Sequence, residues 1–249
     1  MLLALYGIIF LVVYHFMNIE FKPEVIFFLG KFGVTNSLIA STLAVSAIFL
    51  LLFLSSRKFK EIPGGGQSVL EMIYEGFLNF YEGILVDKKT TKFFFPVLFG
   101  FFFFITISNW MGILPGVGSI LITEHGKSFP LIRSTFSDLN MTLTLGLISV
   151  IGINVAALWT LKMEYVKKFM NIIGPLEIFG ELAKILSFSL RLFGNIFAGE
   201  VLLTVISVIA SYGAPVPFLG LEIFVGFVQA LIFTTLTTIF LKVALSHDH

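Results

Sequence analysis

Residues 174–210 of the chain read GPLEIFGELAKILSFSLRLFGNIFAGEVLLTVISVIA, a mostly apolar stretch that is broken by ionisable side chains. A helix from residue 175 to residue 210 would hold 36 residues, or about 54 Å at ~1.5 Å per residue. The hydrocarbon core of a membrane is only about 30 Å thick. We therefore expect this helix to be strongly tilted or to begin outside the hydrocarbon. Pro175 suits its first turn, where the missing N–H of proline would have no helical partner.

This stretch holds charge that the other apolar segments almost lack. Its polar and ionisable side chains include Glu177, Glu181, Lys184, Ser187, Arg191, Asn195 and Glu200. An ionised side chain in hydrocarbon costs at least about 2.5–3.5 kcal/mol on insertion scales, so such groups normally face water, a partner or one another. Helical spacing puts Arg191 on one face with the two upstream glutamates, the lysine and Asn195. Glu200 lies half a turn round the helix from Arg191 and about 13.5 Å along its axis.

The next apolar span, at residues 218–245, adds Glu222 and Gln229, which are seven residues apart and share a face. A Gly- and Pro-containing turn at 211–217 predicts that the two helices are antiparallel neighbours. In such a hairpin, residues at equal depth have numbers that add up to a constant total. The totals nearly agree for Arg191 with Gln229 and for Glu200 with Glu222. We expect each of these pairs to lie at one level.

The chemistry of these groups predicts proton transfer. Two carboxylates at one depth repel when both are ionised in a low dielectric, so the pair Glu200 and Glu222 is suited to hold and pass a proton. Arg191 does not lose its proton, which makes it a fixed positive barrier rather than a relay. A guanidinium between two carboxylate-lined paths would let protons reach the membrane middle from each side and block direct passage. The alternative is a structural ion network, as Glu181 with Lys184 could form.

The composition of the whole chain fits this hypothesis. The 249 residues include 57% hydrophobic and 12% charged residues, no Cys, and a formal net charge of +1. Soluble domains have about 25% charged residues, so a soluble enzyme and a disordered chain are excluded. The near-neutral charge argues against a nucleic-acid partner. No Gly-x-x-x-x-Gly-Lys-Ser/Thr phosphate loop is present, and we expect no cofactor, no metal and no catalysis by the chain alone.

The apolar segments predict an all-α polytopic membrane protein with about five spans and a long, tilted helix hairpin at its C-terminal end, because no period-2 alternation supports a β-barrel. The expected membrane domain is 33–249, with spans at about 33–54, 93–114, 139–161, 174–210 and 218–245. Residues 67–86 predict an amphipathic helix on the inner surface. Residues 1–32 would form an outer-side segment, in which 1–17 is an interfacial helix or an extra span.

Lysines and arginines set the expected orientation. With five spans and the N-terminus outside, ten of them fall on the inner side and four on the outer side. The inner set is Arg57, Lys58, Lys60, Lys88, Lys89, Lys92, Lys162, Lys167, Lys168 and Lys242, and the outer set is Lys22, Lys31, Lys127 and Arg133. This distribution predicts an outer N-terminus and an inner C-terminus.

The run SLRLFGNIFAGE, from Ser189 to Glu200, resembles subunit a of the F-type ATP synthase, the stator part of its membrane proton channel. The resemblance covers about residues 33–249 and has a bacterial pattern, with an organelle of bacterial descent as the less favoured source. Supporting stretches are Pro175-Leu176-Glu177, Gln229-Ala230-Leu231-Ile232-Phe233, Ser137-Asp138-Leu139-Asn140-Met141-Thr142, Asn109-Trp110-Met111-Gly112-Ile113-Leu114-Pro115, and Pro63-Gly64 before the amphipathic helix.

The resemblance implies roles for the matching residues. Arg191 would be the essential arginine that faces the rotating ring of subunit c. Glu200 would be the acid of the outer half-channel, with Glu222 where some members have His and others have Glu. Six further positions would line the path: Asn195 and Gln229 near the arginine, Glu177 and Ser187 at the inner half-channel, and Asp138 and Asn140 near the outer entrance.

The implied partners are the subunit c ring, the subunit b peripheral stalk, the other ATP synthase subunits, the lipid bilayer and protons. The implied location is the bacterial plasma (inner) membrane. Two alternatives stay open. A self-contained secondary transporter would often show inverted repeats and broken helices, and the sequence shows neither. A purely structural anchor would use the same charges as a buried ion network.

Overall fold

The structure is a computed structural model that describes residues 23–56, 64–85, 87–114, 117, 121–124, 127–163, 165, 174–209 and 213–246. Five helices in this part are long and apolar enough to cross a membrane. They are α2 (Asn36–Ser56), α4 (Lys88–Ile113), α5 (Leu139–Leu161), α7 (Gly174–Ile209) and α8 (Pro215–Leu245). The predicted all-α membrane fold is confirmed, and the chain is an integral membrane protein.

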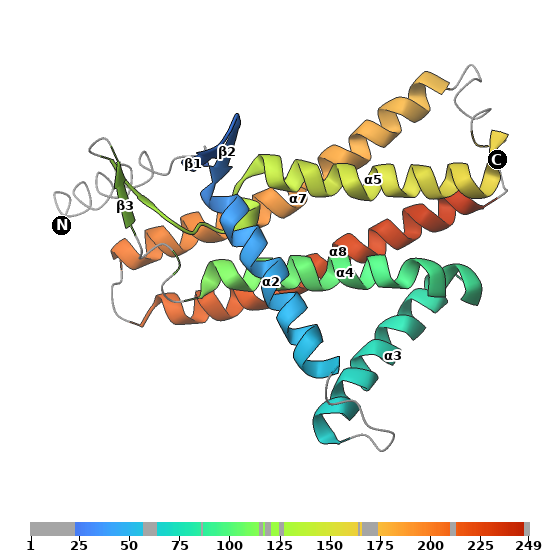
Figure 1. Cartoon of the computed structure of the whole chain (residues 1–249), viewed down its shortest axis with the longest axis horizontal. Coiled ribbons are helices and arrows are strands. Elements are labelled where there is room, and N and C mark those ends of the chain that lie inside the picture. The colour runs from blue at the N-terminus through green and yellow to red at the C-terminus, as the bar shows by residue number, and fades with distance from the viewer. Residues whose placement is uncertain are drawn as a thin grey trace.

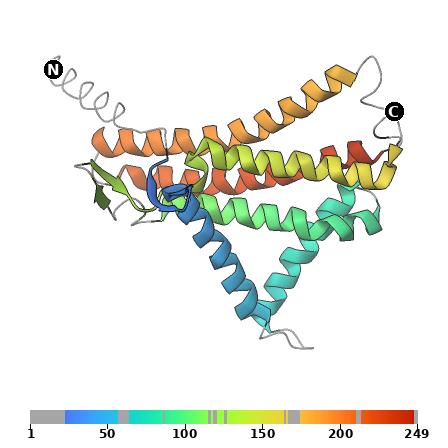
Figure 2. The same ribbon diagram turned by 45° about the horizontal axis from the view of Figure 1, so that its top comes forward.

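Four of these helices form a bundle. In Figures 1 and 2, α4, α5, α7 and α8 run roughly along one direction, and the N-terminal part of α7 leads away from its neighbours. The core of the bundle is built from Phe102 and Ile105 of α4, Phe188 and Leu192 of α7, and Phe233 of α8. Such interdigitated side chains fix the helices relative to one another, so polar groups on facing helices hold defined positions.

Helices α2 and α3 (Gly65–Leu85) form a V that projects from the bundle (Figures 1 and 2). Helix α3 is amphipathic, and its Tyr81 packs with Phe95 and Leu98 of α4 in a separate core cluster. Most other α3 side chains are exposed or half-buried. The helix is where the sequence predicts it, and its placement on the inner membrane surface stays a prediction.

Helix α4 begins five residues earlier than the sequence analysis expects, because Asp87 caps a polar first turn. The Asp87 carboxylate accepts hydrogen bonds from the backbone N–H of Lys89 (3.3 Å) and Thr90 (2.9 Å). Aspartate at this position satisfies backbone donors that have no helical partner. The hydrogen bond that the Thr90 hydroxyl donates to the same carboxylate lowers the pKa of Asp87 most, and the two backbone N–H bonds lower it further. Residues 88–92, which precede the span expected from the sequence, are therefore helical.

Helix α8 also begins earlier than expected, at Pro215 rather than at residue 218. Proline is favoured in the first turn of a helix, because its fixed φ is helical and its missing N–H would be unpaired there. Gly213 precedes it with a φ of +79°, a conformation that favours glycine. Helix α8 thus includes the last residues of the predicted turn.

Two short antiparallel hairpins accompany the helices. Strands β1 (Val25–Leu29) and β2 (Phe32–Thr35) precede α2, and β3 (Leu121–Glu124) and β4 (Lys127–Pro130) precede the 3₁₀ helix η1 (Thr135–Ser137). Because β2 takes up residues 32–35, the first span begins at Asn36 rather than at 33. The predicted helix or span at residues 1–17 lies outside the described residues.

Candidate functional site

The side chain of Glu222 packs against α7 at the residue next to Glu200. Glu222 of α8 lies directly over Gly199 of α7, so closely that a Cβ on Gly199 would come within 2.9 Å of the Glu222 Cδ. One of the Glu222 oxygens is buried without a hydrogen-bond partner. The structure therefore brings this predicted pair to one level.

A second contact fixes the same register farther along the hairpin. The rings of Phe188 in α7 and Phe233 in α8 have centroids 4.6 Å apart. The residue numbers of this pair add up to the same total as those of Gly199 and Glu222. Arg191 and Gln229 lie between these two contacts, and their numbers give nearly the same total, so they occupy one level of the hairpin.

Arg191 is the least neutralised cation of the site. Its Nη2 donates to the Ser187 Oγ at 3.4 Å, and its Nη1 is buried without a hydrogen-bond partner. Among the described residues, no carboxylate lies within ion-pair distance of it. The Nε2 of the buried Gln229 is also without a partner. Asn195, one turn beyond Arg191, is half-buried.

On the N-terminal side of Arg191 in α7, the structure forms the ion pair that the sequence left open as a structural alternative. The Lys184 Nζ lies 2.6 Å from the Glu181 Oε1. The second Glu181 oxygen accepts a hydrogen bond from the Asn154 Nδ2 of α5 at 3.0 Å, and Tyr165 donates its hydroxyl to the Asn154 Oδ1. Burial, with the charges of Glu181 and Glu177, raises the pKa of Tyr165 to about 12. These contacts tie α5 to α7.

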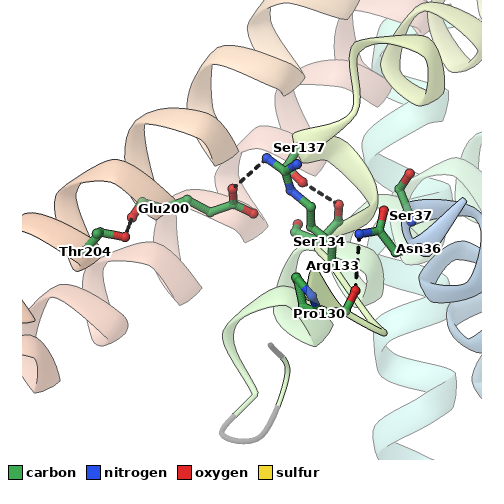
Figure 3. A network of polar contacts seen from close by, with 8 residues as sticks. All are labelled: Asn36, Ser37, Pro130, Arg133, Ser134, Ser137, Glu200 and Thr204. Atoms are coloured by element: carbon green, nitrogen blue, oxygen red, sulfur yellow. Dashed lines mark hydrogen bonds and ion pairs between the residues drawn. The ribbon is translucent and has the colours of Figure 1, made fainter. Parts of the chain in front are cut away.

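On the C-terminal side of Arg191 in α7, Arg133 reaches Glu200. Figure 3 shows the guanidinium, which comes from the segment between β4 and η1, pointing at the Glu200 carboxylate with 3.7 Å between Nη2 and Oε2. The sequence analysis treats Arg133 only as an outer positive charge. No spacing rule relates it to Glu200, because 67 positions separate the two residues and only the packing of η1 on α7 brings them together.

Asp138, a predicted outer-entrance residue, is buried at the start of α5. Its carboxylate accepts from the Asn140 N–H and from the Ser37 Oγ of α2, both at 2.9 Å. It is therefore an N-cap that also joins α2 to α5. Asn140 itself is exposed, and the structure does not bring either residue into contact with Glu200.

Sequence reasoning also missed a clamp between α4 and α8. Asn109 donates its Nδ2 to the Gly226 carbonyl at 2.9 Å, and Trp110 donates its Nε1 to the Ile223 carbonyl at 3.0 Å. Both carbonyls lie within one turn of Glu222, so the clamp positions that part of α8. The motif around Asn109 and Trp110 was the only signal in the sequence, and it did not indicate the partner.

The arrangement joins α7, α8 and the segment before η1 through Glu222, Gly199, Arg133 and Glu200. The described residues contain no group of three or more metal-ligating side chains. A family model described as ATP synthase A chain matches residues 38–242. The chain belongs to the ATP synthase A chain family. The match covers the five apolar helices almost completely, including every candidate residue named above.

Individual relatives agree with this family. The chain is 33% identical over 239 residues to the ATP synthase subunit a of Priestia megaterium, an alignment that covers 89% of this chain and 96% of the relative. It is 31% identical over 204 residues to that of Syntrophobacter fumaroxidans, covering 79% and 78%. It is 31% identical over 234 residues to that of Mycobacterium marinum, covering 89% and 92%.

Proposed function

We propose that this chain is the proton-translocating stator subunit in the membrane sector of an F-type ATP synthase. Two offset half-channels would carry protons to and from a carboxylate on a rotating ring of c subunits. The path uses Glu200 and Glu222 on the outer side, and Glu177 with Ser187 on the inner side. Arg191, flanked by Asn195 and Gln229, is the barrier between them. ATP chemistry belongs to other subunits.

The unpaired guanidinium of Arg191 carries this proposal. Lys184 has Glu181 and Arg133 has Glu200 as a partner within the chain. Arg191 has only a hydroxyl, and one of its nitrogens is buried without a partner. A cation inside a membrane helix normally meets an anion or water. An external carboxylate that passes along this face of α7 would supply that anion, as a ring subunit would.

The placement of the other carboxylates supports the two offset paths. Glu200 and Glu222 lie beyond Arg191 toward the end of the bundle that carries β3, β4 and η1, and Glu177 lies toward the start of α7. A proton would enter past the outer pair, neutralise a ring carboxylate, and leave near Glu177 after nearly a full rotation. Each charge moved is worth ~2.3 kcal/mol per 100 mV, and Arg191 prevents a direct leak.

The proposal includes partners and location. The partners are the c ring, the subunit b peripheral stalk and the other ATP synthase subunits, and the membrane is the bacterial inner membrane. The lysines and arginines of the chain favour an outer N-terminus and an inner C-terminus. The matched relatives named above are all bacterial proteins called ATP synthase subunit a.

ATP-driven acidification of inverted membrane vesicles tests this function. The complex with Arg191→Ala is compared with the unaltered complex and with Lys242→Ala, which removes an exposed cation from the inner end of α8. Co-purification with the ring measures assembly. We expect Arg191→Ala to assemble and to lose pumping, and Lys242→Ala to keep both. Normal pumping by assembled Arg191→Ala would refute the barrier.

The vesicle assay and an uptake assay on the purified chain separate the proposed function from its two alternatives. A structural anchor predicts that Arg191→Ala reduces assembly while each assembled complex pumps normally. A secondary transporter predicts substrate uptake by the purified chain in liposomes without a ring, whereas the proposed function predicts none.

A further inference from the structure

Arg133 and Glu200 form a mostly enclosed ion pair. The side chain of Arg133 is 15% exposed and that of Glu200 is 30% exposed, with 3.7 Å between Nη2 and Oε2. Ion pairs on an open surface contribute little, because water screens both charges. Enclosure weakens that screening, so the guanidinium acts strongly on the carboxylate that it faces.

The backbone on both sides of Arg133 is held in place. The Pro130 carbonyl accepts a hydrogen bond from the Asn36 Nδ2 of α2 at 3.3 Å, and the Ser134 carbonyl accepts one from the Ser137 Oγ at 2.8 Å (Figure 3). Ser134 also packs against Gly112 of α4, where a Cβ would come within 2.9 Å of the Ser134 Cβ. Three elements therefore fix the segment that presents the guanidinium.

The other charged groups near Glu200 do not replace Arg133. Glu222, from α8, has the same sign as Glu200. Asp138, at the start of α5, is engaged by Ser37 and by its own helix N-terminus. Arg191 lies on the opposite face of α7, nine residues away. Within the described part of the chain, Arg133 is the only cation at ion-pair distance from Glu200.

We propose that Arg133 is a positioning residue of the outer proton path, which fixes the orientation of Glu200 and tunes proton uptake by the Glu200–Glu222 pair. The inference rests on the proposed function. The nearby positive charge makes the pair release its proton more readily, because it stabilises the anionic form. Without the charge, the pair would hold its proton up to a more alkaline outer pH.

The test is the rate of ATP synthesis by the complex in liposomes, with the outer face of the chain toward the lumen. The lumenal pH is varied while the external pH and the imposed potential stay constant. We expect Arg133→Gln to move the midpoint of the lumenal pH profile by about one pH unit toward alkaline pH. Arg133→Lys keeps the charge and should keep the midpoint near that of the unaltered complex.

Two controls distinguish this role from a structural one. Lys31→Gln removes an exposed cation from the turn between β1 and β2, and we expect no shift. Arg133→Met keeps more of the apolar packing of the side chain and should give the same alkaline shift as Arg133→Gln, so it serves if the glutamine variant does not assemble. A midpoint that stays in place in both variants, or moves toward acid, overturns the proposal.

The variant Glu200→Gln distinguishes a failure of the inference about Arg133 from a failure of the proposed function. If it abolishes ATP synthesis and Arg133→Gln leaves the profile unchanged, the inference about Arg133 fails and the proposed function stands. If assembled Glu200→Gln makes ATP at the normal rate, the outer path does not use Glu200, and the proposed function fails with the inference.

Discussion

The carboxylate of Glu222 lies directly over Gly199, on the neighbouring helix of the C-terminal hairpin. A Cβ at residue 199 would force the end of the Glu222 side chain to move, and the present contact brings Glu222 to the level of Glu200. The hydrogen bonds from Asn109 and Trp110 to α8 hold the same region from the other side. The level of the two carboxylates is thus fixed by close packing as well as by helix spacing.

Adding one methyl group at Gly199 should disrupt the outer carboxylate pair. In Gly199→Ala the new Cβ would come within 2.9 Å of the Glu222 Cδ, so the flexible end of the Glu222 side chain has to swing away from its place against α7. We expect ATP synthesis by the assembled complex to fall by about tenfold, the equivalent of ~1.4 kcal/mol. Gly180→Ala is the matched control, because nothing lies within 4 Å of a Cβ there. Equal activity of the two variants would contradict this prediction.

Loss of the ion pair between Glu181 and Lys184 should lower the thermal stability of the complex more than it lowers proton transport. Removing one partner leaves the other charge in the bundle without compensation, whereas removing both does not. We expect Glu181→Gln and Lys184→Met to destabilise the complex singly and the double variant to be more stable than additivity predicts, with a coupling of about 0.5–3 kcal/mol. Thermal unfolding of the purified complex measures this, and strict additivity would argue against the pair.

Asp138 should tolerate loss of charge but not loss of its acceptor. Asp138→Ala removes the N-cap of α5, at about 1 kcal/mol, and leaves the Ser37 hydroxyl without its acceptor. Asp138→Asn keeps the Oδ1 that accepts from the Asn140 N–H, and its Nδ2 can donate to the oxygen of the Ser37 hydroxyl, which rotates to accept. We therefore expect near-normal thermal stability. Proton-driven ATP synthesis is measured in the same samples. A stable Asp138→Asn complex with reduced synthesis would show that the charge also serves the predicted outer entrance.

Tyr81 should make the stability of the complex sensitive to alkaline pH. Burial raises the pKa of Tyr81 from 10.0 to about 12. Between these values the unfolded chain releases the phenol proton and the folded chain keeps it, so stability falls as pH rises. We expect Tyr81→Phe to reduce the loss of thermal stability between pH 10 and 12. Tyr74→Phe, on the exposed side of the same helix, should leave the loss unchanged.

The fold class and the levels of the candidate site could be read from the sequence. Apolar stretches long enough to cross a membrane predict helices, since a lipid environment requires every backbone group to be paired internally. The regular rise of a helix then fixes the relative depth of Arg191, Glu200, Glu222 and Gln229 once the turn is located. The contacts of Gly199 with Glu222 and of Phe188 with Phe233 agree with that register.

Helix ends and partners between distant segments could not be read in this way. Asp87 and Pro215 extend α4 and α8 through local hydrogen bonding and φ preference, which hydropathy does not detect. The two hairpins depend on pairing between short strands that have no strong pattern. Helix ends and strand pairing depend on local backbone geometry and hydrogen bonding, and not on the apolar length of a segment.

The sequence by itself determined a five-span helical membrane protein with an arginine between two groups of carboxylates, because segment length and helical spacing are local properties of the chain. Only the tertiary structure decided which charges meet. It paired Lys184 with Glu181, placed Arg133 on Glu200 and set Glu222 over Gly199. The physical reason is that ion pairs and close contacts act over a few ångströms, and packing alone brings segments far apart in the chain to that distance.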